Sequence, residues 1–365
     1  MSLRGFRRPK LIQALSQIVM VPLRAAVRLL MLLACAAPGL QAAAGDVEEG
    51  RREFVEPHMG TLFRIVLYAP PGVDGSAAAK AAFARVEALN RVLSDYDPES
   101  EAMRLCREPA GATVPVSTDL FSVLTRARNL AVASGGAFDV TLGPLTLLWR
   151  TCRRSGVLPD PVSLAAARDA SGFAHLQLDE ARRSVRLQRT GMRLDFGGIA
   201  KGFAADAALA VLAQHGVARA LVAASGDLAL GEPPPGKEGW TVALEPFGPT
   251  SGPPSTLVLA NAGVSTSGDT EQSVTLGGVQ YSHIVDPATG LGLTRRVAVT
   301  VVARQATLTD GLATACSVLD AARIRALVEA LPEPAHVIVH ERRPDGSVQC
   351  IAYGRPPASF TSSPP

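Results

Sequence analysis

The first third of the chain alternates between two hydrophobic patterns. Residues 61–69 alternate apolar and polar positions and are rich in β-forming side chains, so they predict a strand. Residues 76–94 and 119–134 instead place apolar side chains at helical spacing. The second of these segments has a serine or threonine cap at 117–118 and a glycine just past its end, so both segments predict helices.

The remainder of the chain mixes short apolar runs with turn-forming residues. Short strands joined by turns are predicted over 176–196, a helix over 199–215 that stops at Gly216, and a buried strand over 218–225 that stops at Gly226. Further strands are predicted at 240–245, 279–285, 297–303 and 335–341, helices at about 309–319 and 321–331, and loops at 232–239 and 246–255. No repeat is visible, and strands and helices do not alternate regularly. This order predicts an α+β fold with mixed or antiparallel sheets and packed helices rather than a doubly wound fold.

Composition supports a sizeable folded body between two atypical ends. The chain has 365 residues, of which 47% are hydrophobic, enough for one large domain or two intimate ones. We expect this body to span residues 53–354. The Pro- and Ser-rich end, residues 355–365, is expected to be disordered.

The N-terminal segment changes the meaning of the net charge. The formal charge of the whole chain is +3, but its first 34 residues hold six basic and no acidic side chains. Without them, 30 basic residues face 33 acidic ones, a balance of about −3. Such a balance gives no indication of a nucleic-acid-binding surface.

Residues 1–44 have the features of an export signal. An unbroken apolar run at 29–37 follows two arginines, is too short to span a bilayer as a mature helix, and is followed by small residues. Leu32-Leu33-Ala34-Cys35 resembles the lipobox of bacterial lipoproteins. Lipidation at Cys35, which would hold the protein at the periplasmic face of the inner membrane, and cleavage near Ala44, which would release it into the periplasm, both stay open, as does an uncleaved anchor. Met20 would give a signal peptide of more ordinary length.

The remaining cysteines do not suggest a metal or redox site. Cys106, Cys152, Cys316 and Cys350 are scattered without a C-x-x-C spacing. Four cysteines allow three pairings, and the sequence does not select among them. We interpret them as isolated buried thiols.

The stretch LDFGGIAKGFAAD, residues 194–206, places two glycines and a lysine at the start of a predicted helix. Gly197 and Gly198 let the backbone approach a ligand, and the helix that follows directs free N–H groups at it. Lys201 in the first helical turn has the unfavourable sign for a helix N-terminus, and a bound phosphate would resolve that conflict. The spacing fits neither the P-loop nor G-x-G-x-x-G. The alternative is an ordinary helix start with a solvated lysine.

Three other stretches carry candidate ligand-binding residues. In SGGAFDVTLGPL, the ring of Phe138 beside the carboxylate of Asp139 suits a heteroaromatic group, although a core phenylalanine before a Gly-Pro turn is equally compatible. Tyr96 lies in the turn LSDYDPES, where packing does not demand a tyrosine, and Met59 directly precedes a predicted strand.

A histidine and a carboxylate–hydroxyl pair complete the candidates. His283 stands between Ser282 and an Asp-Pro turn, and a histidine there is either structural or a proton acceptor. Asp310 and Thr314 are four residues apart on one helical face and suit a hard cation such as Mg²⁺. The alternative for Asp310 is that it stabilises the start of its own helix.

Taken together, these motifs resemble those of a known family. MGT, LSDYDP, GGAFD-x-T-x-GPL, LDFGGIAKG, SGD, STSGD, YSHIVDP-x-TG and TLTDGLATA follow one another over residues 59–315. This order resembles the ApbE family, the FAD:protein FMN transferases, and implies a T-fold-related architecture with FAD in a groove between two subdomains. The resemblance assigns flavin contacts to Met59, Tyr96, Ala137, Phe138, Asp139, Asp195, Lys201 and Ile284. It assigns Mg²⁺ to Asp310, Thr314 and the backbone carbonyl of Gly198, and a general base to His283.

The resemblance also implies a reaction and its partners. The FMN moiety of FAD would pass to a threonine or serine hydroxyl of an acceptor protein, usually a subunit of a membrane redox complex, with release of AMP. Two alternatives stay open, an FAD diphosphatase that uses water and a flavin-binding lipoprotein without catalysis. The chain departs from the family pattern at Ser225-Gly226-Asp227, where GGD is common, and in the turn at 288–291.

Overall fold

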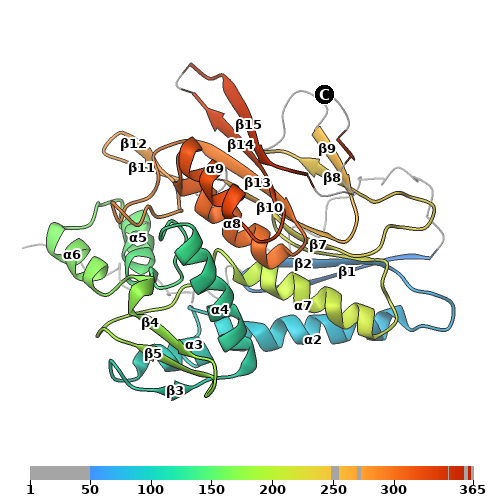
Figure 1. Ribbon diagram of the computed structural model, residues 1–365, viewed down its shortest axis with the longest axis horizontal. Helices are drawn as coiled ribbons and strands as arrows, with labels where there is room; N and C mark the ends of the chain where they lie inside the picture. The colour runs from blue at the N-terminus through green and yellow to red at the C-terminus, as the bar shows by residue number, and fades with distance from the viewer. Residues whose placement is uncertain (1–49, 248–254, 269–272, 344, 357–360, 363–365) are drawn as a thin grey trace, which may run out of the picture. The chain divides into compact units, whose positions relative to one another are not determined.

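An eight-stranded antiparallel sheet forms the centre of the fold, in the order β1-β2-β6-β7-β10-β13-β14-β15 (Figure 1). Its strands are β1 (Arg51–His58), β2 (Thr61–Tyr68), β6 (Ala220–Ala224), β7 (Asp227–Leu230), β10 (Ala262–Gly268), β13 (Val297–Ala303), β14 (His336–Arg342) and β15 (Val348–Gly354). The computed structural model describes residues 50–247, 255–268, 273–343, 345–356 and 361–362. The export signal, including Cys35, Ala44 and Met20, lies outside these residues.

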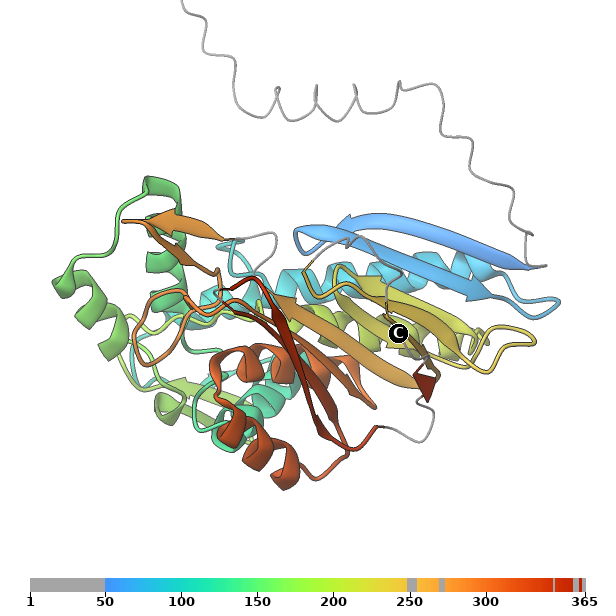
Figure 2. The ribbon, with the colours of Figure 1, turned by 90° about the horizontal axis from the view of Figure 1, so that it is seen from above.

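The alternation of side chains along the strands explains what covers each face of the sheet. Ile65 and Leu67 of β2 point into the main hydrophobic cluster, whereas Val66 and Tyr68 point into a second one. The main cluster is closed by the helices α2 (Gly75–Leu93), α7 (Ala200–Gln214), α8 (Ala306–Val318) and α9 (Ala321–Ala330). Figures 1 and 2 show α2 and α7 lying side by side. The second cluster is closed by β8 (Trp240–Leu244) and β9 (Ser255–Leu259).

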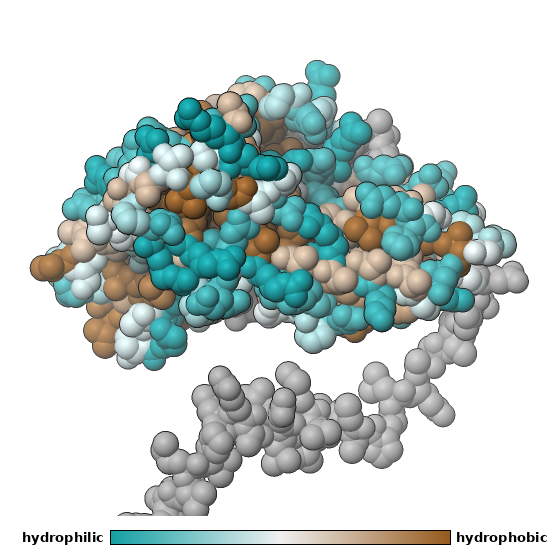
Figure 3. Space-filling model, turned by 90° about the horizontal axis from the view of Figure 1, so that it is seen from below, coloured by the Kyte–Doolittle hydropathy of each residue, from teal (hydrophilic) through white to brown (hydrophobic). Residues whose placement is uncertain are grey.

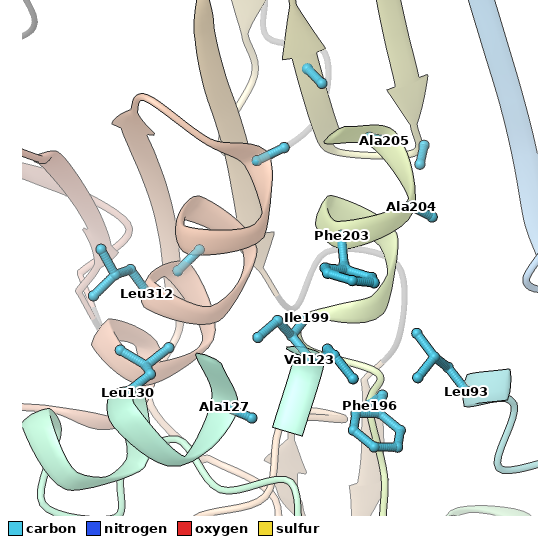
Figure 4. Packing of buried hydrophobic residues seen from close by; sticks show 14 of the residues in the cluster. Leu93, Val123, Ala127, Leu130, Phe196, Ile199, Phe203, Ala204, Ala205 and Leu312 are labelled. Atoms are coloured by element: carbon cyan, nitrogen blue, oxygen red, sulfur yellow. The ribbon is translucent and has the colours of Figure 1, made fainter. Parts of the chain in front are cut away.

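A third group of elements also contributes side chains to the main cluster. It comprises α3 (Glu101–Arg107), α4 (Thr118–Ala133), β3 (Val114–Pro115), β4 (Leu176–Asp179), β5 (Ser184–Leu187) and a 3₁₀ turn, η1 (Phe173–His175). Figure 4 shows Val123, Ala127 and Leu130 of α4 close to Ile199 and to Leu312 of α8. Phe196 and Ile199 are almost fully buried. The segment around 194–199 is therefore held by packing on both sides.

A separate small cluster, called here the satellite cluster, joins two helices to a hairpin. Its buried members are Leu145, Trp149, Cys152, Ala167, Leu276 and Val285. They come from α5 (Gly143–Ser155), α6 (Pro161–Asp169), β11 (Val274–Leu276) with its partner β12 (Val279–Tyr281), and the loop after β12. Exposed apolar side chains, including Val157 and Val162, gather at the end of the molecule where α6 lies (Figure 3). Gly50–Pro365 nonetheless form one compact unit.

The predicted α+β class with antiparallel sheets is confirmed, and the differences from the predicted elements have local causes. The strand expected at 279–285 stops at Tyr281, because the Ser282 hydroxyl accepts a hydrogen bond from the Ile284 N–H at 3.1 Å and turns the chain. The expected Gly143-Pro144 turn begins α5, because proline suits the first helical turn. Sequence reasoning also missed β1, α3, β7, β10 and β15. Within the tail expected to be disordered, Thr361–Ser362 form β16, which pairs with β9.

The described cysteines are unpaired, as predicted. Cys106, Cys152, Cys316 and Cys350 are all free thiols. Cys152 and Cys316 are buried, but Cys350 is exposed, so the expectation of burial is wrong for Cys350, which lies on the edge strand β15. None of the helices in the described ranges is both long and apolar enough to cross a membrane.

Candidate active site

The segment Asp195–Gly198 is braced so that its backbone faces α8. The Asp195 carboxylate accepts a hydrogen bond from the Gly197 N–H at 2.8 Å. The backbone N–H of Asp195 donates to the Val140 carbonyl at 2.8 Å. Position 198 has no room for a side chain, because a Cβ there would lie 2.8 Å from Thr314 Oγ1. The Gly198 backbone and the Thr314 hydroxyl are therefore neighbours. Their binding of Mg²⁺ stays a prediction.

Lys201 is the second residue of α7, and its charge is met by protein carboxylates. Its Nζ lies 2.9 Å from Asp227 Oδ2 and 3.7 Å from Asp310 Oδ1. Burial opposes the lysine's charge, but these two carboxylates outweigh it and raise the Lys201 pKa. The lysine is thus ion-paired rather than freely solvated, and carboxylates of this chain offset its unfavourable charge at the helix N-terminus.

Asp310 is buried, as is Asp227. The α8 helix begins at Ala306, so Asp310 lies in its second turn, and the alternative that it caps its own helix is wrong. Its Oδ2 accepts a hydrogen bond from the Gly202 N–H at 3.0 Å in the first turn of α7. Burial and the neighbouring Asp227 raise the Asp310 pKa to about 7, while Lys201 acts in the opposite direction. A second cation would stabilise the ionised pair of carboxylates.

Asp227 was not assigned a role from the sequence, although its SGD motif was noted. It begins β7 after a tight turn in which Ser225 adopts a φ of +57°, a conformation that favours glycine. The register of β2 with β6 puts the Met59-Gly60 turn at the same end of the sheet. Met59 itself has a φ of +49°, which is uncommon for a side chain of this size. Two strained turns therefore meet at the sheet end that carries Asp227.

Tyr96 and Asp195 are linked through Arg150 of α5. The Tyr96 side chain is 78% exposed, and the Arg150 guanidinium lies 4.6 Å from its ring centroid. The same guanidinium donates to Asp195 Oδ2 at 2.7 Å and to the carboxylate of Asp95. Thr146 Oγ1 also donates to Asp195 Oδ2, at 2.7 Å. Sequence reasoning missed Arg150 because these contacts join segments far apart in the chain.

The Ala137–Asp139 stretch is buried beside Gly198. Phe138 is 4% exposed and belongs to the main hydrophobic cluster. It therefore occupies a core position, which was the second of the two interpretations that the sequence allowed. Both Asp139 carboxylate oxygens accept hydrogen bonds within the chain, from Thr141 and from the Phe173 N–H. The contacts of these three residues with FAD stay a prediction.

His283 lies in the loop between β12 and β13, and its Nδ1 is buried without a hydrogen-bond partner in the described part of the chain. Burial, Arg153 and Lys201 lower its pKa to about 4, so the imidazole is neutral at pH 7. The loop is fixed against the satellite cluster, since Trp149 Nε1 donates to the Ser282 carbonyl at 3.0 Å. Ile284 is buried next to it. A neutral imidazole with an unpartnered nitrogen can accept a proton.

Comparison with known proteins identifies the family. The sequence profile of the ApbE family matches residues 59–339. The FAD:protein FMN transferase of Treponema pallidum (strain Nichols) is 32% identical over 316 residues, covering 82% of this chain and 87% of that protein. The chain belongs to the ApbE family. The FAD:protein FMN transferase of Vibrio cholerae serotype O1 (strain ATCC 39541 / Classical Ogawa 395 / O395) is 31% identical over 290 residues, covering 78% of this chain and 86% of its own length.

A solved ApbE-family structure has the same fold. The flavin transferase ApbE from Vibrio cholerae superposes with a TM-score of 0.74 at 29% identity, covering 83% of this chain and 97% of that one. The antiparallel α+β architecture predicted from the sequence is therefore that of the ApbE family.

The oxygen atoms at this ApbE-family site fit a hard cation. The described residues contain no cluster of three or more His, Cys, Asp or Glu side chains suited to a metal. The candidate oxygen donors are instead the Asp310 carboxylate, the Thr314 hydroxyl and the Gly198 carbonyl, with Asp227 beyond Lys201. Mg²⁺ accepts such a sparse oxygen set and completes it with water or phosphate oxygens. The cradle at Gly198, which a Cβ would fill, agrees with this fit.

Proposed function

We propose that this chain is a Mg²⁺-dependent transferase that moves the FMN moiety of FAD to a threonine or serine hydroxyl of an acceptor protein and releases AMP. The observation that carries the proposal is the junction of α7 and α8. There, Lys201 Nζ lies 2.9 Å from the Asp227 carboxylate and 3.7 Å from the Asp310 carboxylate. It also donates to the Gly197 carbonyl at 3.3 Å, and the next residue, Gly198, packs against Thr314. The family relatives named above support the reaction type.

Each residue of the candidate site has a separate role in the proposed reaction. Mg²⁺, held by Asp310, Thr314 and the Gly198 carbonyl, would neutralise the diphosphate of FAD. Lys201 adds a fixed positive charge at the same place. The acceptor oxygen forms a bond to the FMN phosphorus while the bond to the AMP oxygen breaks, and His283 takes the proton that the acceptor hydroxyl loses. The depressed pKa of His283 keeps it neutral and able to accept this proton.

An FAD diphosphatase is the alternative that uses the same residues, with water in place of the acceptor hydroxyl. Incubation with FAD, Mg²⁺ and a purified subunit of a membrane redox complex from the same cells distinguishes the two. Fluorescence that stays with the acceptor in a denaturing gel, with one AMP released per flavin attached, supports the transferase. Free FMN with AMP would support the hydrolase, and intact FAD would indicate a flavin-binding protein without catalysis.

Asp310→Asn is the matched variant for this assay. It keeps the size of the side chain and an oxygen that can accept from the Gly202 N–H, but it removes the charge that the metal needs. We expect turnover to fall at least about 100-fold, the scale of losing one charge-stabilising contact in an active site. Undiminished Mg²⁺-dependent turnover in this variant would remove Asp310 from the metal site.

For the location of the enzyme, we propose export to the periplasmic side of the inner membrane. The support is the basic and apolar segment before residue 45 and the lipobox-like sequence ending at Cys35. Intact-mass analysis of the protein from the membrane fraction tests this. A diacylglyceryl-modified Cys35 identifies a lipoprotein, a free terminus near Gly45 identifies soluble periplasmic protein, and an intact Met1 contradicts both.

A further inference from the structure

The guanidinium of Arg150 joins three segments that are distant in sequence. It donates to the carboxylates of Asp95 and Asp195 and stacks on the ring of Tyr96. We infer that Arg150 is a positioning residue for FAD: it fixes the Tyr96 ring and the Asp195 carboxylate in the arrangement that receives a heteroaromatic ring of the dinucleotide. The inference rests on the proposed function, because it gives these two residues a flavin substrate.

The helix that carries Arg150 is itself held in place. Trp149, the residue before it, is 1% exposed in the satellite cluster and donates to the Ser282 carbonyl. Arg150 therefore leaves α5 in a fixed direction, toward the segments that belong to the main hydrophobic cluster. Its side chain is 26% exposed, and each of the two carboxylates is 10% exposed. Ion pairs that are this well shielded from water are stronger than surface pairs.

The geometry requires an arginine. A planar guanidinium has N–H donors on separate nitrogens and can donate to two carboxylates while its face covers an aromatic ring. Nη2 of Arg150 donates a hydrogen bond to Asp195, and Nη1 donates one to Asp95. A lysine ammonium carries the same charge but has neither the fork nor the flat face. The Arg150→Lys substitution therefore separates charge from geometry.

Tyr96 is placed as an open aromatic surface. A tyrosine that is 78% exposed gains little from packing, yet its ring is held by the cation 4.6 Å from its centroid. No other aromatic ring or cation of the described residues lies over it. One face is thus occupied by Arg150, and the other is available to stack on a flat ligand.

Arg150 also offsets the repulsion between the carboxylates of Asp95 and Asp195. Burial and the nearby Asp195 raise the pKa of Asp95, and Arg150 counteracts this shift. Removing the guanidinium leaves two shielded carboxylates close together, which costs stability whether or not FAD is involved. The experiment must therefore separate loss of stability from loss of FAD positioning.

Four variants make that separation. Arg150→Lys and Arg150→Gln test geometry and charge. Asp95→Asn/Arg150→Gln removes one of the two opposed carboxylates and should restore thermal stability. Arg154→Gln is the matched control, because Arg154 lies about one turn further along α5, is exposed, and among the described residues donates a hydrogen bond only to the Thr151 hydroxyl, at 3.4 Å. FAD affinity is measured by isothermal titration, thermal midpoints by melting, and KM and kcat by AMP release with Mg²⁺.

We expect both single Arg150 variants to lose at least about tenfold in FAD affinity, the scale of one charge-assisted contact, with KM rising more than kcat falls. The double variant should regain stability but not affinity, and Arg154→Gln should match the wild type. Affinity that returns with stability in the double variant, or wild-type affinity in Arg150→Lys, would overturn the inference. If the wild-type protein binds no FAD, the proposed function fails. If it binds FAD and the Arg150 variants bind equally well, only the inference fails.

Discussion

At the scale of residues, His283 separates binding from chemistry. His283→Asn should lose on the order of 10²–10⁴ in kcat, the usual contribution of a general base, with FAD affinity nearly unchanged. The reason is that its lowered pKa keeps the imidazole neutral at pH 7, and no group in the described ranges hydrogen-bonds its Nδ1. Single-turnover flavin transfer and FAD titration on the variant measure the two effects. A histidine that only braces the Asp286 turn would instead lower FAD affinity and thermal stability together.

The same histidine makes the stability of the protein depend on pH. Its pKa is about 4 in the folded chain, below the ordinary value of 6.5. Between these pH values, His283 is protonated in the unfolded chain but not in the folded chain. Its effect on the free energy of unfolding is therefore absent above pH 6.5, and the protein loses stability as the pH falls toward 4. Denaturant unfolding should show that lowering the pH from 7.5 to 5 costs the wild type about 2 kcal/mol more than it costs His283→Gln. Equal losses in the two proteins would contradict the shifted pKa.

At the scale of elements, the crossing of α7 and α8 sets the site. A Cβ on Gly202 would collide with the Ala306 carbonyl, so the glycine permits the close approach that places Lys201 beside Asp310. Asp206 of α7 then caps α8, accepting hydrogen bonds from the N–H groups of Ala306 at 2.9 Å and Thr307 at 2.8 Å. The cap comes from another helix, since Gln305 gives α8 none.

Asp206→Ala should therefore cost stability and activity together. The loss of a helix cap is worth about 1–2 kcal/mol, and a displaced α8 carries Asp310 and Thr314 with it, so kcat should fall as well. Asp74→Ala is the control, because the Asp74 carboxylate also accepts from two N–H groups at a helix start, that of its own helix α2, but lies at the opposite end of β2 from the site. Melting curves and AMP release on both variants test this. Full activity in Asp206→Ala would show that the cap does not position the site.

The sequence could predict local motifs but not the contacts between them. Helical periodicity located α2, α4 and α7, and the spacing of Asp310 and Thr314 put both on one helix. It did not locate the start of α8, because its cap, Asp206, is 100 residues earlier. Asp227 and Arg150 were missed for the same physical reason. Each acquires its role only when the fold brings a charged partner to it.

At the scale of the whole molecule, the satellite cluster holds the loop of the proposed base against the main body. The indole of Trp149 links the satellite cluster to this loop through its hydrogen bond to the Ser282 carbonyl. A Cβ on Gly292 would lie 2.6 Å from the same indole ring. The loop is therefore packed closely on α5. Its position should affect catalysis more than it affects the core.

Trp149→Phe and Trp240→Phe form a matched pair that tests this arrangement. Both indoles are buried and donate to a backbone carbonyl at 3.0 Å, but Trp240 lies in the cluster under β8 and β9. Each substitution should cost about 1–2 kcal/mol of stability. Only Trp149→Phe should lower kcat, because it alone releases the His283 loop. Equal kcat values in the two variants would contradict a role for the satellite cluster in catalysis.

We propose that the junction of α7 and α8 holds both the metal and the diphosphate of FAD. A crystal of the protein grown with FAD and Mn²⁺ in place of Mg²⁺, measured for anomalous scattering, tests it most directly. We expect one strong Mn²⁺ peak in contact with the Asp310 carboxylate, the Thr314 hydroxyl and the Gly198 carbonyl, with the FAD diphosphate beside it. FAD bound without a metal at these three residues, or bound elsewhere on the molecule, would contradict it.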